Sequence, residues 1–125
     1  MKKILIVDDE QDIRELLKKR LEQNKFIAIT AADGQEVLDI CKTNKPDLVL
    51  LDIAMPEMDG YETCEKLKQD KETSGIPVLF LTAKDLEPES VIQRCKDMGA
   101  YGYLPKTSTF QELLEKIKEI LFRAY

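Results

Sequence analysis

Short, unbroken aliphatic runs alternate along this chain with stretches in which apolar residues recur at helical spacing. The runs occupy residues 4–7, 48–51 and 78–81, and a polar residue follows each of them. Runs of this kind are typical of strands buried on both faces, because a strand with one face in water alternates apolar and polar residues. Such strands form parallel sheets that helices cover on both sides. The alternation therefore predicts an α/β fold.

Two further extended segments, 26–30 and 101–104, are less uniformly apolar. The second contains Gly102 and runs into Pro105, which cannot donate a hydrogen bond to a neighbouring strand. These features are typical of edge strands. We therefore expect a (βα)5 chain with a doubly wound, parallel, five-stranded sheet in the order 2-1-3-4-5.

Helices are expected between and after these strands, over about 11–23 and 58–70 and from Gly34, Pro88 and about Thr109 onward. The residues expected to face the core are Ile13, Leu16, Leu17, Leu21, Val37, Leu38, Cys41, Tyr61, Cys64, Leu67, Val91, Ile92, Cys95, Met98, Phe110, Leu113, Leu114, Ile117 and Leu121. Two helix starts carry capping signals. Asp59 is suited to be an N-cap, and Ser108 with Gln111 has the spacing of a capping box.

Length and charge exclude several classes of protein. The 125 residues suit one domain, which we expect to span 1–125. Nineteen basic against twenty-four acidic residues give a net charge of −5, so direct nucleic-acid binding is not expected. The aliphatic runs are too short for a membrane span, and too few residues separate Lys3 from Asp8 for a signal-peptide core. We therefore expect a cytoplasmic protein.

The chain has no histidine, which excludes histidine-based catalytic triads and zinc sites. Its three cysteines, Cys41, Cys64 and Cys95, are widely spaced and odd in number, so we expect them unpaired and buried in a reducing compartment. Any catalysis must therefore use carboxylates, lysine, hydroxyl groups or a hard metal ion.

Polar residues stand where the predicted central strands end. They are Asp8, Asp9, Asp52, Thr82 and, just past the last strand, Lys106. Ligands of such sheets bind at the carboxyl ends of the strands. Three clustered carboxylates require a cation or a raised pKa, and oxygen ligands favour Mg²⁺ or Mn²⁺ over zinc. Carboxylates, a hydroxyl and an ammonium group around such an ion are suited to phosphoryl transfer.

Residues 7–10 (VDDE), 51–60 (LDIAMPEMDG), 81–83 (LTA) and 103–106 (YLPK) resemble the signature of response-regulator receiver domains. These are the CheY-like domains of two-component signalling. The resemblance covers essentially the whole chain, with the motifs in the family's order and spacing. It implies the flavodoxin/CheY-like version of the predicted fold.

The resemblance assigns roles to individual residues. Asp52 corresponds to the phosphoacceptor, and Asp8 and Asp9 to the acidic pair that helps Asp52 to hold Mg²⁺. The backbone carbonyl of Ala54 corresponds to a further metal ligand. Ala54 also occupies one of two positions that tune the lifetime of the phosphorylated form, and Lys84 occupies the other.

Three more residues match the family's motifs. Thr82 corresponds to the switch hydroxyl, Lys106 to the lysine that binds the phosphoryl group, and Tyr103 to the rotating aromatic. The family has proline after this lysine, with a cis peptide bond, whereas this chain has Thr107. A cis bond before a residue other than proline costs about 2.5–4 kcal/mol. The loop is therefore expected to be strained or to follow a trans path.

We expect a stand-alone switch, and the resemblance implies that it catalyses only its own phosphorylation and dephosphorylation. A histidine kinase or histidine phosphotransfer protein would be the donor. A downstream protein would read the signal on the face formed by the fourth helix, the fifth strand and the fifth helix, and the chain would be a monomer or a weak, phosphorylation-dependent dimer.

Other interpretations remain open at this point. Each site residue has an ordinary explanation by itself, such as acids at a helix start or a solvated lysine. A second hypothesis is that this chain is the receiver domain of a larger response regulator, cyclase or hybrid histidine kinase. A phosphatase of the haloacid-dehalogenase type needs Asp-x-Asp after the first strand, and an FMN-binding flavodoxin needs a phosphate loop there, but residues 8–10 are Asp-Asp-Glu.

Overall fold

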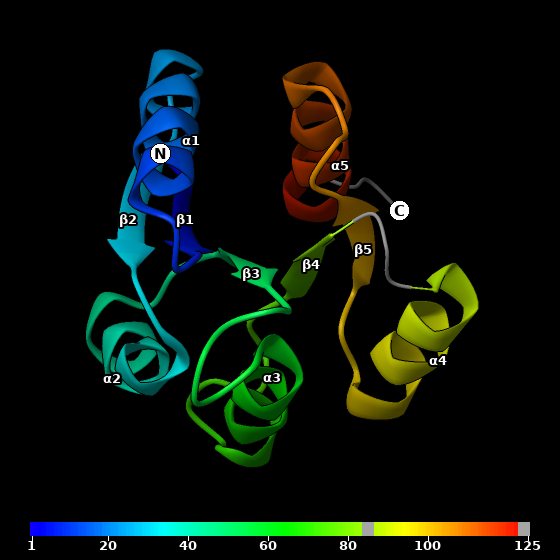
Figure 1. Cartoon of the computed structure of the whole chain (residues 1–125). Helices are drawn as coiled ribbons and strands as arrows, with labels where there is room; N and C mark the ends of the chain where they lie inside the picture. Colours follow the sequence, from blue (N-terminus) through cyan, green and yellow to red (C-terminus); the bar gives the residue numbers. More distant parts are fainter. Residues whose placement is uncertain (84–86, 123–125) are drawn as a thin grey trace.

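The computed structural model describes residues 1–83 and 87–122, which form one parallel sheet with helices on both faces (Figure 1). The strands are β1 (Lys3–Val7), β2 (Ile27–Ala31), β3 (Leu48–Asp52), β4 (Val78–Thr82) and β5 (Gly102–Pro105). The helices are α1 (Gln11–Gln23), α2 (Gly34–Asn44), α3 (Gly60–Gln69), α4 (Pro88–Met98) and α5 (Phe110–Phe122). The strand order is β2-β1-β3-β4-β5, so the predicted fold is confirmed.

The sheet separates two apolar cores. Figure 1 shows α1 and α5 on one face and α2, α3 and α4 on the other. Successive residues of a strand point to opposite faces. In β1, Ile4 and Ile6 therefore pack with α1 and α5, whereas Leu5 and Val7 pack on the other side. The unbroken aliphatic runs follow from this arrangement, because both faces of the central strands are covered.

Two predicted core residues are wrong. The side chain of Leu16 on α1 is 50% exposed, and that of Ile92 on α4 is 42% exposed. Both have helical spacing that suits a buried face. Leu16 instead borders an open groove between α1 and the start of α5, and Ile92 lines a hollow between α4 and β5.

The helix starts use the predicted chemistry with one shift. Asp59 caps α3 by accepting a hydrogen bond from the backbone N–H of Glu62 at 2.9 Å. The capping box of α5 lies one residue later than predicted, at Thr109 and Glu112. Each of these two side chains accepts a hydrogen bond from the other's backbone N–H, at 3.0 and 3.1 Å. The shift follows from the first helical residue, which is Phe110.

The three cysteines are buried and unpaired, as predicted. Burial raises the pKa of the Cys41 and Cys64 thiols to about 11, so both are protonated near neutral pH. The longest helices of the described segments have 13 residues, and none of them combines the length and the apolar character needed to cross a bilayer.

Candidate functional site

Two buried aspartates lie side by side at the carboxyl edge of the sheet. β1 and β3 are neighbours, and Val7 is paired with Leu51, so the next residues, Asp8 and Asp52, come together. Asp8 is 1% exposed and Asp52 is 2% exposed. Two carboxylates in such a place repel each other, and the site requires a positive charge.

Lys106 supplies that charge. Its Nζ lies 3.0 Å from Oδ2 of Asp52, 3.0 Å from Oδ2 of Asp8 and 3.8 Å from Oε1 of Glu10. The backbone N–H of Lys106 donates to the carbonyl of Thr82 at 2.7 Å, which fixes the start of the loop after β5. The structure therefore brings the predicted lysine to both predicted aspartates.

Burial and charge act in opposite directions on these groups. Burial raises the pKa of Asp52 to about 6, and the negative charge of Asp8 adds to the rise, while the hydrogen bond from Lys106 opposes it. Burial lowers the pKa of Lys106, but the two carboxylates outweigh burial, and the pKa of the lysine is raised overall. Lys106 is therefore a charged ammonium group near neutral pH.

The acids of the β1–α1 turn are arranged in a way that suits a hard cation. One carboxylate oxygen from each of Asp8, Asp9 and Glu10 lies within 4.8 Å of the others. Oδ1 of Asp8 accepts the backbone N–H of Glu10 at 2.9 Å. Oδ2 of Asp8 is buried and accepts no well-aligned hydrogen bond from the described residues, although the Lys106 ammonium lies 3.0 Å away. This oxygen has capacity for a cation, and the all-oxygen donor set fits Mg²⁺.

The other predicted residues lie around this centre. Thr82 ends β4, the strand next to β3, and is 3% exposed. Ala54 is exposed, and its backbone N–H donates to Oδ1 of Asp52 at 3.3 Å. Tyr103 on β5 is partly buried against the core on the side of α2–α4. Lys84 lies outside the described residues.

The loop after β5 takes the trans path. None of the described residues is joined by a cis peptide bond, so the bond between Lys106 and Thr107 is trans. Lys106 nevertheless reaches the two aspartates. Proline at the next position is therefore not required to bring this lysine to the site.

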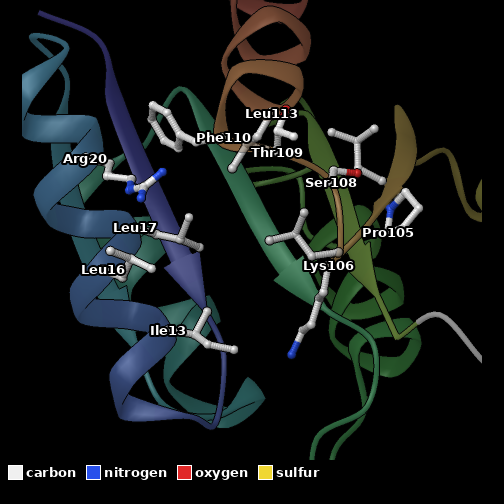
Figure 2. Close-up of a pocket in the computed structure, with 12 residues that line it drawn as sticks. Ile13, Leu16, Leu17, Arg20, Pro105, Lys106, Ser108, Thr109, Phe110 and Leu113 are labelled. Atoms are coloured by element: carbon white, nitrogen blue, oxygen red, sulfur yellow. The ribbon is translucent and has the colours of Figure 1, made fainter.

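An apolar groove of about 210 Å³ begins beside the site, between α1 and the start of α5 (Figure 2). Lys106 lines one end of the groove, and Leu16 and Leu17 form part of the α1 wall. Towards the other end, the guanidinium of Arg20 lies 5.4 Å from the centre of the Phe110 ring.

Sequence reasoning missed three residues of the site. Glu10 joins the acids around Lys106, and Gly60 packs against the backbone of Asp52. Arg14 donates from its guanidinium to the backbone carbonyl of Asp8 at 2.7 Å. For Arg14 the sequence did contain a signal, because a basic residue in the first turns of a helix is unusual where acidic residues are favoured.

Comparisons with known proteins agree with this geometry. Residues 4–118 match the response regulator receiver domain family. The chain is 43% identical over 123 residues to the alkaline phosphatase synthesis transcriptional regulatory protein PhoP of Bacillus subtilis (strain 168), covering 98% of this chain and 50% of that protein. The chain thus spans about half the length of the curated relatives it matches.

Solved structures agree as well. The fold matches the chemotaxis protein CheY4 of Vibrio cholerae with a TM-score of 0.89 at 31% identity, over 97% of this chain and 99% of that one. It matches the N-terminal domain of a response regulator receiver protein from Methanoculleus marisnigri JR1 with a TM-score of 0.76 at 41% identity, over 99% of both chains. Since family, sequence and fold agree over nearly its whole length, the chain belongs to the CheY-like response regulator receiver domains of two-component signalling, which are signalling modules rather than true enzymes.

Proposed function

We propose that this protein is a phosphorylation-controlled switch whose phosphoacceptor is Asp52. The observation that carries the proposal is the position of this carboxylate, which is buried at the end of β3, 3.0 Å from Lys106 and beside Asp8. These 125 residues contain no histidine, so the phosphohistidine lies outside them, on a histidine kinase or a histidine phosphotransfer protein.

The transfer requires an ionised acceptor. A pKa of about 6 leaves Asp52 mostly ionised at neutral pH. One of its oxygens attacks the phosphorus, the P–N bond breaks, and the imidazole leaves with the electron pair and takes a proton from solvent. The Lys106 ammonium neutralises charge on the phosphoryl oxygens, and the Thr82 hydroxyl donates a hydrogen bond to them.

Asp8, Asp9, Asp52 and the backbone carbonyl of Ala54 would hold Mg²⁺, or Mn²⁺ in its place. When bound, the ion neutralises negative charge on the transferring phosphoryl group. The buried Oδ2 of Asp8, which is paired only with the Lys106 ammonium among the described residues, and the close carboxylates of the turn support this assignment. A cation there also relieves repulsion among the acids.

The output face is proposed to be α4, β5 and α5, where a downstream protein binds. Thr82 and Tyr103 would carry the change from the phosphorylated site to this face. Ile92 and Tyr101 are 42% and 37% exposed there, which gives a partner apolar surface to cover. Phosphorylation would change this surface and thereby partner binding or weak dimerisation of an otherwise monomeric protein.

We propose that Ala54 and Lys84 set the lifetime of the phosphorylated form. The methyl group of Ala54 cannot orient a hydrolytic water, and Lys84 would shield the phosphoryl oxygens. Slow hydrolysis is the expected consequence. Faster decay of the phosphorylated form in Ala54→Asn and Lys84→Ala would support this role, and unchanged decay in both would contradict it.

Treatment with acetyl phosphate and Mg²⁺ tests the central proposal directly. Intact-mass spectrometry should show one added phosphoryl group on the wild type and none on Asp52→Asn. Asp39→Asn is the matched control, because it makes the same chemical change on the exposed surface of α2. Full labelling of Asp52→Asn would contradict the assignment.

A second proposal concerns the whole protein. The curated relatives are about twice as long as this chain, which favours a receiver domain that controls further domains over the stand-alone switch. An immunoblot of the protein in its native cells distinguishes the two by size. The buried, unpaired Cys41, Cys64 and Cys95 support a cytoplasmic location in either case.

A further inference from the structure

The β1–α1 turn is held by a side chain that reaches back from α1. Nη1 of Arg14 donates to the backbone carbonyl of Asp8 at 2.7 Å, across six residues of sequence. The backbone N–H of Arg14 also donates to the carbonyl of Glu10 at 3.1 Å. The second bond is the first i→i−4 bond of α1, which any residue except proline would make, so the contribution of the Arg14 side chain is its bond to the Asp8 carbonyl.

These acids repel one another and tend to open the turn. One carboxylate oxygen from each of Asp8, Asp9 and Glu10 lies within 4.8 Å of the others. Lys106 counters the repulsion on the carboxylate side, at 3.0 Å from Asp8 and 3.8 Å from Glu10. On the backbone side, a hydrogen bond from a charged guanidinium holds the carbonyl of Asp8.

We propose that Arg14 is a positioning residue for Mg²⁺ binding, which acts by fixing the Asp8 carbonyl and with it the carboxylates of the turn. This inference rests on the proposed metal site, and it adds a residue that itself touches neither the ion nor the phosphoryl group. The partly buried position of Arg14 limits the competition of water for this hydrogen bond.

A competing explanation predicts the opposite sign. If Arg14 acted only through its charge, removing it would make the turn more negative and would tighten Mg²⁺ binding. If Arg14 positions the acids, removing it loosens the turn and weakens Mg²⁺ binding. Arg14→Ala removes both charge and hydrogen bond, whereas Arg14→Lys keeps the charge and one possible donor.

The chain provides a matched control on the same helix. Arg20 lies six residues further along α1, and its guanidinium contacts the Phe110 ring. Arg20→Ala removes the same side chain and the same charge from α1 but leaves the turn untouched. It therefore reports the general effect of losing an α1 arginine.

The experiment is calorimetric titration of the unphosphorylated protein with MgCl₂ at fixed ionic strength. Arg14→Ala should weaken binding about tenfold, the smaller of the effects typical of outer-shell groups. Arg14→Lys should recover part of the loss, and Arg20→Ala should bind as the wild type does. Unchanged or tighter binding by Arg14→Ala would overturn the inference.

Thermal unfolding of the same samples separates positioning from a purely structural role. A structural role lowers the melting temperature of Arg14→Ala and leaves the Mg²⁺ affinity of the folded protein unchanged, which would also overturn the inference. Should Arg14→Ala not fold, Arg14→Lys and Arg14→Gln carry the same comparison. Absence of Mg²⁺ binding by the wild type would instead contradict the metal site of the proposed function.

Discussion

Gly60 lies so close to the backbone of Asp52 that a Cβ atom at Gly60 would be 2.3 Å from the Asp52 carbonyl oxygen. The backbone N–H of Gly60 donates to the carbonyl of Ile53 at 2.8 Å. The first residue of α3 is therefore in direct contact with the end of β3. This contact closes the loop that follows Asp52, and only glycine fits there.

We expect Gly60→Ala to destabilise the fold by about 2 kcal/mol or more, because the added methyl group meets backbone atoms that cannot rotate away. Urea unfolding measures the change. Gly75→Ala is the control, since a Cβ atom there meets no atom within 4 Å, and it should stay within about 0.5 kcal/mol of the wild type. Equal stability of the two variants would contradict the close contact.

Asp52→Asn should stabilise the protein near neutral pH. Burial raises the pKa of Asp52 from 3.8 to about 6, so the folded state holds this proton more tightly than the unfolded state does. The ionised carboxylate therefore destabilises the fold above pH 6, and this cost disappears as the pH falls below the unfolded value. We expect a gain of about 1–2 kcal/mol at about pH 7.5 without metal.

Urea unfolding of Asp52→Asn and the wild type at several pH values checks the sign. The difference should shrink as the pH falls from about 6 toward 4, where the wild-type carboxyl is protonated in the fold. Asp39→Asn, on the exposed surface of α2, should show no such trend. A gain that does not depend on pH would point to another cause.

Lys45→Gly should stabilise α2. Lys45 is the C-cap of this helix and has a left-handed backbone with φ 48° and ψ 63°. This conformation costs residues with a Cβ atom about 1–2 kcal/mol, and glycine adopts it freely but loses more chain entropy on folding. We expect a net gain of about 0.5–1 kcal/mol in thermal or urea unfolding.

The control for Lys45→Gly is the same substitution inside a helix. Lys19 is exposed in the middle of α1, where its backbone is helical, and Lys19→Gly should cost about 1 kcal/mol. A loss of stability in both variants would show that the left-handed conformation of Lys45 carries no strain.

Leu16→Ser should slow phosphorylation by a protein donor and leave phosphorylation by a small-molecule donor unchanged. The groove beside Lys106 includes Leu16, so a protein that brings phosphohistidine to Asp52 is expected to cover it, whereas acetyl phosphate is too small to do so. We expect slower phosphorylation by a histidine kinase that acts on the wild type, by about tenfold, and unchanged phosphorylation by acetyl phosphate.

Ile27→Ser is the matched control for Leu16→Ser. Ile27 is an aliphatic residue of similar exposure, 40% against 50%, on the edge strand β2. The Ile27→Ser variant should be phosphorylated at the wild-type rate by both donors. Equal effects of Leu16→Ser on both donors would indicate damage to the site itself rather than to docking.

The sequence by itself determined the fold and placed Asp8 and Asp52 at one edge of the sheet. The aliphatic runs at 4–7, 48–51 and 78–81 predicted the central strands, because only strands covered on both faces lack polar alternation. Asp8 and Asp52 followed from that prediction, since parallel strands place their carboxyl ends at one edge. Both inferences use patterns of neighbouring residues, which local sequence contains.

Only the tertiary structure decided which residues touch. Lys106 and Asp52 are 54 positions apart, and their 3.0 Å contact depends on the path of the loop after β5. The exposure of Leu16 depends on how far α5 lies from α1, which the periodicity of α1 does not encode. The bond from Arg14 to the Asp8 carbonyl depends on the angle at which α1 leaves β1. These are distances between elements, and they are set by the packing of the whole domain rather than by any one segment.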